Sequence, residues 1–441
     1  MRLKNKLMIF SAMVFMLVIV VSSSMVFAAD ANTWTTKASM STARDDHRVA
    51  VVDGKIYAFG GYNITDDYHN SVEEYNPSTN TWTIKASMPT TRRDFQVAVV
   101  EGKIYAIGGS NGTNGFLNSM EEYDPSTNTW TTKAPMTTSR SCHQVAVVGG
   151  KIYAIGGYND INSYLNSVEE YDPSTNTWKS KSPMADARHN HQLAIVDGKI
   201  YAIGGLDPIM RNTVEEYDPA TNTWRSKATM PTDRTLYQVA VVGGKIYAIG
   251  GYNGSNYLNT VEKYNPATNT WEGKATMPTA RVHHQVTVVG GKIYAIGGYT
   301  GSSRNLVEEY DPATNTWTIK APMTTGRYRH QLTEIGGKIY AIGGRANVCL
   351  NSVEEYTPEL PIDIVNTAIL DITMITGQMK EYNLTSTQLN DFLTWYDGRS
   401  KGNGLAYYIF NKINTNEPFP VIREYIPYDK IASFEVKEYA E

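Results

Sequence analysis

The fold is decided by residues 140–184, which read RSCHQVAVVGGKIYAIGGYNDINSYLNSVEEYDPSTNTWKSKSPM. The stretch holds four runs that are typical of β-strands: HQVAVV, KIYAIGG, NSVEEYDP and TWKSKSPM. Gly-Gly separates the first two runs, a polar loop follows the second, and Asp172-Pro173 opens a turn before the last. No part of it has the 3.6-residue apolar period of a helix. The stretch therefore predicts a unit of four strands.

This unit recurs seven times along the chain. The first glycine of each Gly-Gly doublet returns after 46 to 48 residues, and so does the tyrosine that ends each VEEY-like run. A tryptophan keeps the same spacing, at Trp34, Trp82, Trp130, Trp178, Trp224, Trp271 and Trp317. Three independent markers in one register exclude coincidence. Four strands per unit at this period predict the blades of a propeller.

The repeat pattern is Arg-x-x-His-Gln, Gly-Lys-Ile-Tyr-Ala-Ile-Gly-Gly, Val-Glu-Glu-Tyr-Asp-Pro and Asn-Thr-Trp, followed by methionine. It resembles the kelch repeat over residues 33–358. The Gly-His and Trp-Asp marks of WD40 repeats, which also form propellers, are absent. The resemblance implies an all-β, seven-bladed β-propeller. Because most kelch propellers are protein–protein interaction platforms, it also implies a binding role.

The order of the runs shows how the ring closes, with the strands of a blade written a to d from the axis outward. The first run, ANTWTTKASM at residues 31–40, is a lone d strand. The last unit has strands a, b and c but lacks the tryptophan strand. We therefore expect the strand around Trp34 to complete the blade that ends near Tyr356, which leaves no unpaired edge.

The chain divides into three predicted segments. Residues 1–28 have a basic start, an uncharged apolar run and a small-residue cleavage site, which indicate a signal peptide and a secreted or extracellular-surface protein. An uncleaved membrane anchor is the alternative. Residues 29–358 form the propeller. Residues 359–441 depart from the repeat and predict a small α+β module of order β-β-α-β-β-β, with a helix after a capping box at 385–388.

Charge and cysteine content limit the partners. Without the first 28 residues the chain has 37 basic and 44 acidic residues, and 37 − 44 gives −7. This charge argues against nucleic acid as a partner. We expect a monomer without a cofactor, a metal or, once the signal is removed, a membrane span. Cys142 and Cys349 fall in separate blades, so both are predicted to be free.

The loops between strands b and c and between strands d and a share one face, and they vary most between repeats. They combine tyrosine with asparagine, aspartate and glycine, a mixture that suits sugars or peptides. The alternative is that they are only solvated turns. The predicted binding residues are Tyr62, Asp67, Tyr68, Phe116, Tyr158, Asp160, Tyr164, His189, Asn190, Tyr252, Tyr257, Tyr299, Arg304, Tyr328 and Arg345.

Two residue types recur in the d–a loops of all or most repeats. The seven arginines, Arg44 to Arg327, could form an anion-binding mouth, but pairing with a glutamate of the same repeat is favoured. The resemblance agrees, because arginine belongs to the kelch pattern at this place. The two residues after each arginine vary and are better candidates for specificity. A histidine follows in five repeats, where Phe95 and Tyr237 stand in the other two, which indicates packing and not a metal site.

The chain has no phosphate loop, Cys-x-x-Cys, zincin motif or nucleophile elbow, and no catalytic residue is assigned. We expect a secreted or cell-surface protein that binds a glycan or a protein through the b–c and d–a loops. The alternative is a carbohydrate-active enzyme such as a sugar mutarotase, an activity known among kelch-like propellers. For it the sequence offers only Asp45, Asp46 and Asp94 near the axis.

Overall fold

The structure is a computed structural model. It describes residues 31–63, 67–112, 115–160, 163–359, 368–384, 407–413 and 421–438, together with Leu389, Phe392, Leu393, Trp395, Tyr396 and Arg399. The predicted signal peptide and the capping box at 385–388 lie outside the described residues.

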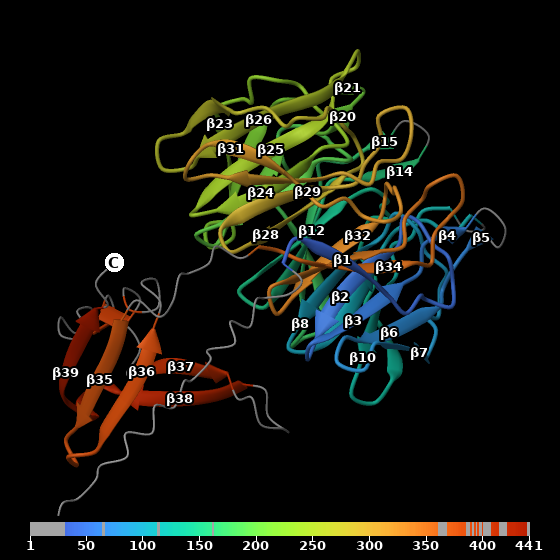
Figure 1. Cartoon of the computed structure of the whole chain (residues 1–441). Helices are drawn as coiled ribbons and strands as arrows, with labels where there is room; N and C mark the ends of the chain where they lie inside the picture. Colours follow the sequence, from blue (N-terminus) through green and yellow to red (C-terminus); the bar gives the residue numbers. More distant parts are fainter. Residues whose placement is uncertain are drawn as a thin grey trace, which may run out of the picture.

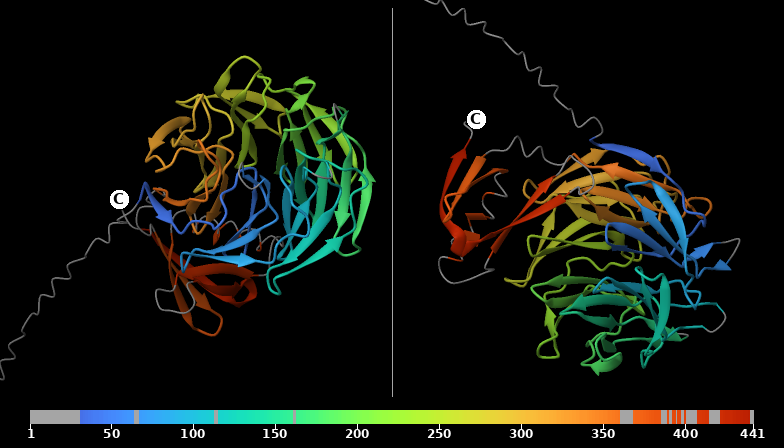
Figure 2. Two further views of the ribbon diagram at one scale, coloured as in Figure 1. Left: turned by 90° about the vertical axis from the view of Figure 1, so that its right-hand side faces the viewer. Right: turned by 90° about the horizontal axis from the view of Figure 1, so that it is seen from below.

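Seven four-stranded antiparallel sheets follow one another around a ring (Figures 1 and 2). In each of them strand a pairs with b, b with c and c with d, and the a strands of neighbouring blades contact one another around the axis. In the order a to d, blade 1 consists of β2 (Arg48–Val52), β3 (Lys55–Phe59), β6 (Val72–Asn76) and β7 (Thr81–Lys85), and blade 2 of β8 (Gln96–Val100), β9 (Lys103–Ile107), β10 (Met120–Asp124) and β11 (Thr129–Lys133). Blade 3 consists of β12 (Gln144–Val148), β13 (Lys151–Ile155), β16 (Val168–Asp172) and β17 (Thr177–Lys181). Blade 4 consists of β18 (Gln192–Val196), β19 (Lys199–Ile203), β22 (Val214–Asp218) and β23 (Thr223–Lys227). Blade 5 consists of β24 (Gln238–Val242), β25 (Lys245–Tyr252), β26 (Tyr257–Asn265) and β27 (Thr270–Lys274). Blade 6 consists of β28 (Gln285–Val289), β29 (Lys292–Ile296), β30 (Val307–Asp311) and β31 (Thr316–Lys320). Blade 7 consists of β32 (Gln331–Ile335), β33 (Lys338–Ile342), β34 (Val353–Thr357) and β1 (Thr33–Lys37). The predicted seven-bladed propeller is confirmed.

The seventh blade takes its outer strand from the start of the propeller. Strand β1 pairs with β34 in antiparallel register, with Trp34 opposite Tyr356. Asn32 accepts a hydrogen bond from the Tyr356 hydroxyl at 2.9 Å, the same bond that Asn80 makes with Tyr75 in blade 1. The predicted closure is therefore confirmed, and strand β34 is left without an open edge.

The core lies between neighbouring blades. Apolar residues of strands b and c, such as Ile104 and Tyr123, are fully buried there. The tryptophan of each d strand covers the outer end of this layer and donates to the preceding blade, as Trp130 Nε1 does to the carbonyl of Ala86 at 2.8 Å. Its ring lies 5.1 Å from that of Tyr123. The repeated tryptophan is thus a packing residue between neighbouring blades.

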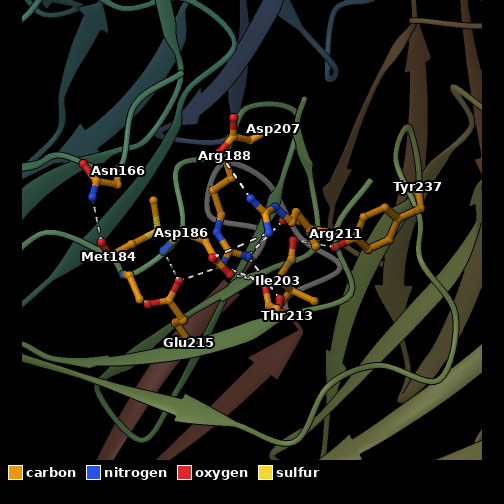
Figure 3. Close-up of polar contacts among 12 residues, drawn as sticks. Asn166, Met184, Asp186, Arg188, Ile203, Asp207, Arg211, Thr213, Glu215 and Tyr237 are labelled. Carbon is orange, nitrogen blue, oxygen red and sulfur yellow. Dashed lines mark hydrogen bonds and ion pairs between the residues drawn. The ribbon is translucent and has the colours of Figure 1, made fainter. Parts of the chain in front are cut away.

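The repeated arginines are fully buried and hold each blade together. In blade 4, Arg188 Nη1 donates to the carbonyls of Gly204 and Thr213, and Nη2 lies 2.6 Å from Glu215 Oε1 (Figure 3). Every blade has such an ion pair. The seven pairs are Arg44–Glu73, Arg92–Glu121, Arg140–Glu169, Arg188–Glu215, Arg234–Glu262, Arg281–Glu308 and Arg327–Glu354. The favoured interpretation is confirmed, and these arginines are not an anion-binding mouth.

The b–c connections are more regular than the loops that we expected. Three carry a two-stranded hairpin: β4 (Tyr62–Asn63) with β5 (Asp67–Tyr68), β14 (Tyr158–Asp160) with β15 (Ser163–Tyr164), and β20 (Leu206–Asp207) with β21 (Ile209–Met210). In blade 5, strands b and c themselves extend into the connection. The first loop residue also bridges to the d–a loop of its own blade, as Tyr158 does to Ser141. These bonds fix the backbone beneath the loop side chains.

The described part of the C-terminal segment follows the predicted order. It has β35 (Ala368–Met374) and β36 (Met379–Leu384), then the helical residues Leu389, Phe392, Leu393, Trp395, Tyr396 and Arg399. After them come β37 (Tyr407–Ile413), β38 (Val421–Pro427), a 3₁₀ turn η1 (Tyr428–Lys430) and β39 (Ile431–Glu438). The sheets are β36-β35-β39 and β37-β38, and Phe392 is buried in the core. Among the described residues, no helix is long and apolar enough to cross a membrane.

Candidate functional site

A ring of seven side chains surrounds the axis on the face of the b–c and d–a loops. Each ring residue stands two positions after the buried arginine and has φ between 49° and 55°. The amide of Cys142 donates to the carbonyl of Asp94, and the amide of Asn190 donates to that of Cys142, so backbone bonds run from blade to blade. The members of this mouth ring are Asp46, Asp94, Cys142, Asn190, Leu236, His283 and Arg329.

The mouth ring opens into a cavity of about 610 Å³ on the axis. Below the ring the cavity is lined by the first residue of strand a, which is glutamine in six blades and Arg48 in blade 1. The six are Gln96, Gln144, Gln192, Gln238, Gln285 and Gln331. This glutamine was not among the binding residues predicted from the sequence. The available signal was its place at the start of the innermost strand, directly after the variable loop.

The charged groups of the cavity gather on blades 7, 1 and 2. Arg329 Nη1 lies 3.1 Å from Asp46 Oδ2, and Arg93 Nε lies 3.4 Å from Asp94 Oδ2. Asp45 is fully buried beside Asp46, and burial, followed by the charge of Asp46, raises the pKa of Asp45 to about 6. Burial and Asp46 also raise the pKa of Asp94. This side of the cavity therefore combines arginines in ion pairs with carboxyl groups whose pKa values are raised.

The other half of the mouth is neutral. Burial, together with the charge of Arg329, lowers the pKa of His283 to about 4. Burial and the charge of Asp94 raise the pKa of Cys142 to about 12. Leu236 and Asn190 carry no charge. Near pH 7 the blades 3 to 6 thus present no ionised side chain of the mouth ring to the cavity.

Many of the predicted loop aromatics contact one another across blade boundaries. Phe116 of blade 2 lies 5.2 Å from Tyr158 of blade 3, and Tyr164 stacks on His189 of blade 4 at the same centroid distance. The Nδ1 atom of His189 lies 3.0 Å from the carbonyl of Leu206. The loops of blades 2 to 4 therefore share one aromatic cluster.

A second pair of rings carries a cation. Tyr62 and Tyr68 of the first b–c hairpin lie 5.9 Å apart, edge to face. The Arg93 guanidinium of blade 2 lies 5.4 Å from the first ring and 5.0 Å from the second. Such contacts hold the arginine between its carboxylate partner and the rings.

A further run of aromatic rings crosses blades 5, 6 and 7. Ring centroids lie 5.9 Å apart for Tyr252 and Tyr257, 6.4 Å for Tyr257 and Tyr299, and 5.3 Å for Tyr299 and Tyr328. Beside these rings lies a groove of about 600 Å³. The groove is lined by Leu236, Tyr252, Ser255, Asn256, Tyr257, Val282, His283 and Tyr299.

Of the remaining predicted residues, one lines the axial cavity and two others, Arg304 and Arg345, line neither cavity. Asn190 lines the axial cavity. Arg304 Nε donates to the Thr300 hydroxyl of its own loop, and Arg345 Nη1 lies 3.6 Å from Asp45 Oδ2. Asp67 and Asp160 belong to strands of the b–c hairpins, and their side chains lie outside the described part of the structure.

The five repeated histidines are fully buried, like the Phe95 and Tyr237 that replace them, so the packing interpretation is confirmed. Across the described residues, no group of three or more His, Cys, Asp or Glu side chains is placed to hold a metal ion. Neither Cys142 in blade 3 nor Cys349 in blade 7 forms a disulfide, as predicted from their separate blades.

Comparison with known proteins agrees with this geometry. The model of the KLHDC2/KLHL20/DRC7 Kelch-repeats domain matches residues 2–205 and 142–344. The chain belongs to the kelch-repeat family. A search of curated proteins finds an uncharacterised protein of Clostridium acetobutylicum, 36% identical over 76 residues, which are 17% of this chain and 19% of that protein's length. Among solved structures, that of YjhT superposes with a TM-score of 0.53 at 16% identity, over 65% of this chain and 99% of that one, and so shares the fold.

Proposed function

We propose that this kelch propeller is a secreted or cell-surface binding protein whose loop face holds a glycan. The kelch fold itself suggests a binding or scaffold role. The observation that carries the finer proposal is the groove of blades 5 and 6, where three tyrosine rings stand beside uncharged polar side chains. Flat aromatic rings stack on the apolar faces of sugar rings, while the hydroxyl of Ser255 and the amide of Asn256 match sugar hydroxyls.

The rigidity of the groove supports binding. The Tyr252 hydroxyl donates to the carbonyl of Gly254 at 2.7 Å, and the loop turn is held by Asn253, which accepts from the amides of Ser255 and Asn256. Rings that are already fixed lose little conformational entropy when a ligand arrives. The groove volume also lies within the range of about 300 to 1,000 Å³ that is usual for small-molecule sites.

The test is binding of the mature chain, residues 29–441, to an array of glycans and cell-wall polysaccharides, followed by titration calorimetry on the best ligand. Tyr257→Ala should weaken that ligand about tenfold, since a stacked ring contributes on the order of 1.4 kcal/mol. Ile84→Ala is the matched control, because Ile84 is 70% exposed on the outer strand β7, away from the loops. No binding to any glycan would refute the proposal and make a protein partner the leading idea.

A carbohydrate-active enzyme such as a sugar mutarotase is the second candidate. The observation that favours it is the pair of carboxyls Asp46 and Asp94 in the axial cavity, because burial raises the pKa of Asp94, which suits proton transfer. The exchange of sugar anomers can be followed by proton NMR. Complete loss of any such activity in Asp94→Asn, with glycan affinity unchanged, would favour an enzyme over a binder.

A further inference from the structure

We propose that the aromatic groove and the axial cavity form one extended site for a neutral oligosaccharide chain of more than one unit. In this arrangement the outer units stack on the tyrosines and the inner end lies among the glutamines. The inference rests on the proposed glycan binding and adds to it the length, the charge and the direction of the ligand.

The two cavities share a boundary. Leu236 and His283 line both of them, and both residues belong to the mouth ring. The amide of His283 donates to the carbonyl of Leu236, which fixes the backbone at the boundary between the cavities. With volumes of about 610 and 600 Å³, each cavity is large enough for a small ligand by itself. A ligand that uses both must therefore be a chain.

The outer half of the site offers ring faces. Tyr257 is 40% exposed and meets Tyr299 edge to face, at an interplanar angle of 84°. An edge-to-face pair leaves ring faces turned in two directions. Successive units of a chain can lie against them without any charged contact.

The inner half offers amides. Gln96 is already engaged, since its Nε2 donates to the carbonyl of His143 and its Oε1 accepts from Arg48. For the side-chain amides of the other five glutamines, no hydrogen bond to the described residues is found. Each amide can donate two hydrogen bonds and accept two, as the hydroxyl groups of a sugar require. Five such groups around one axis suit the end of a polyhydroxylated chain.

The charges of the cavity argue for a neutral ligand. Of its three arginines, Arg329 is paired with Asp46 and Arg93 with Asp94. The third, Arg48, donates to Gln96 and to the carbonyl of His47. An acidic ligand would have to break these pairs and leave the carboxylates unpartnered, which is costly in a partly buried site.

The experiment is calorimetric titration of the mature chain with cello-, xylo- and chito-oligosaccharides from monomer to hexamer, at low and high salt. Affinity should rise at least tenfold with length in one series and change little with salt. Gln192→Ala combined with Gln238→Ala should weaken the longest oligomer about tenfold, because two hydrogen bonds are lost. The shortest oligomer that binds should be unaffected by this double variant, whereas Tyr257→Ala should weaken every length. Ile84→Ala should change none.

The outcomes separate the two proposals. If no oligosaccharide binds at any length, glycan binding fails and the extended site fails with it. If oligosaccharides bind with an affinity that does not depend on length, or if the double glutamine variant weakens short and long oligomers alike, glycan binding stands and the extended site is refuted. Tighter, salt-sensitive binding of oligogalacturonides than of the neutral series would overturn the assignment of a neutral ligand.

Discussion

The repeated histidines make the stability of the propeller depend on pH. Their rings are fully buried, and none of their nitrogens has a hydrogen-bond partner among the described residues. Burial lowers the pKa of each well below its ordinary value of 6.5. The five are His47, His143, His191, His284 and His330. They stay neutral in the folded chain and take up protons once it unfolds, so stability falls as the pH drops below about 6.5.

The magnitude follows from this linkage. At about pH 5.5 an unfolded histidine is protonated in a ratio of about ten to one, so each buried histidine lowers the free energy of unfolding by about 1.4 kcal/mol relative to pH 7.5. Five of them lower it by about 7 kcal/mol. This loss is comparable to the whole stability of an ordinary domain, about 5 to 15 kcal/mol.

The assay is urea unfolding followed by tryptophan fluorescence, at about pH 7.5 and 5.5, for the native protein and for His143→Phe. Phenylalanine fits the position, because Phe95 occupies it in blade 2. The variant should lose about 1.4 kcal/mol less than the native protein on acidification. The reverse exchange, Phe95→His, should lose about 1.4 kcal/mol more.

Equal losses in all three proteins would refute the reasoning, because the buried histidines would then have ordinary pKa values. Carboxyl groups with raised pKa values, such as Asp45, also titrate in this range, but in the opposite sense, since acid favours their folded form. They are present in every variant and cancel in the comparison.

Three further predictions address the ring, its buried ion pairs and its mouth. Deletion of residues 31–40 removes strand β1 and exposes the edge of β34, so calorimetry should show a lower melting temperature; unchanged melting would contradict the closure. Arg140→Ala leaves the buried carboxylate of Glu169 without its cation, so urea unfolding should show a loss of about 3 to 5 kcal/mol in the free energy of unfolding. A loss under about 1 kcal/mol would mean that water reaches the ion pair. Leu236→Gly relieves a positive φ and should leave stability within about 1 kcal/mol of the native value while oligosaccharide binding weakens; a larger loss of stability would make Leu236 a packing residue.

The sequence predicted the features that follow from the repeats and from their order along the chain. The ring closure followed from counting strands, because Trp34 lacks strands before it and Tyr356 lacks one after it. The arginine–glutamate pair followed from the recurrence of the arginine in all repeats, which favours a role in the scaffold. The small hairpins of the b–c loops were missed, because a pair of two-residue strands leaves no periodicity to detect.

The glutamine ring shows why the rest could not be predicted. In one repeat, the glutamine at the start of strand a is a single polar residue beside a buried histidine. This position alone indicates only a structural role for the glutamine. Only the seven-fold arrangement brings Gln144 and Gln331, far apart in the chain, around one cavity. In the same way Phe116 and Tyr158 meet because their blades are neighbours, and each loop alone gives no sign of the contact.

The residue types found at positive φ differ between the mouth ring and the turns at the other end of the strands. The first residue of each a–b turn, at the other end of the strands, has the same left-handed conformation. In four of the seven blades this residue is glycine: Gly149, Gly243, Gly290 and Gly336. In the mouth ring none of the seven is glycine, although φ is nearly the same. Leucine, histidine, cysteine and arginine are strained there by about 1 to 2 kcal/mol each, and glycine would relieve the strain. The backbone bonds between blades do not use these side chains, so the side chains remain available for contacts across the mouth, as Arg329 makes with Asp46.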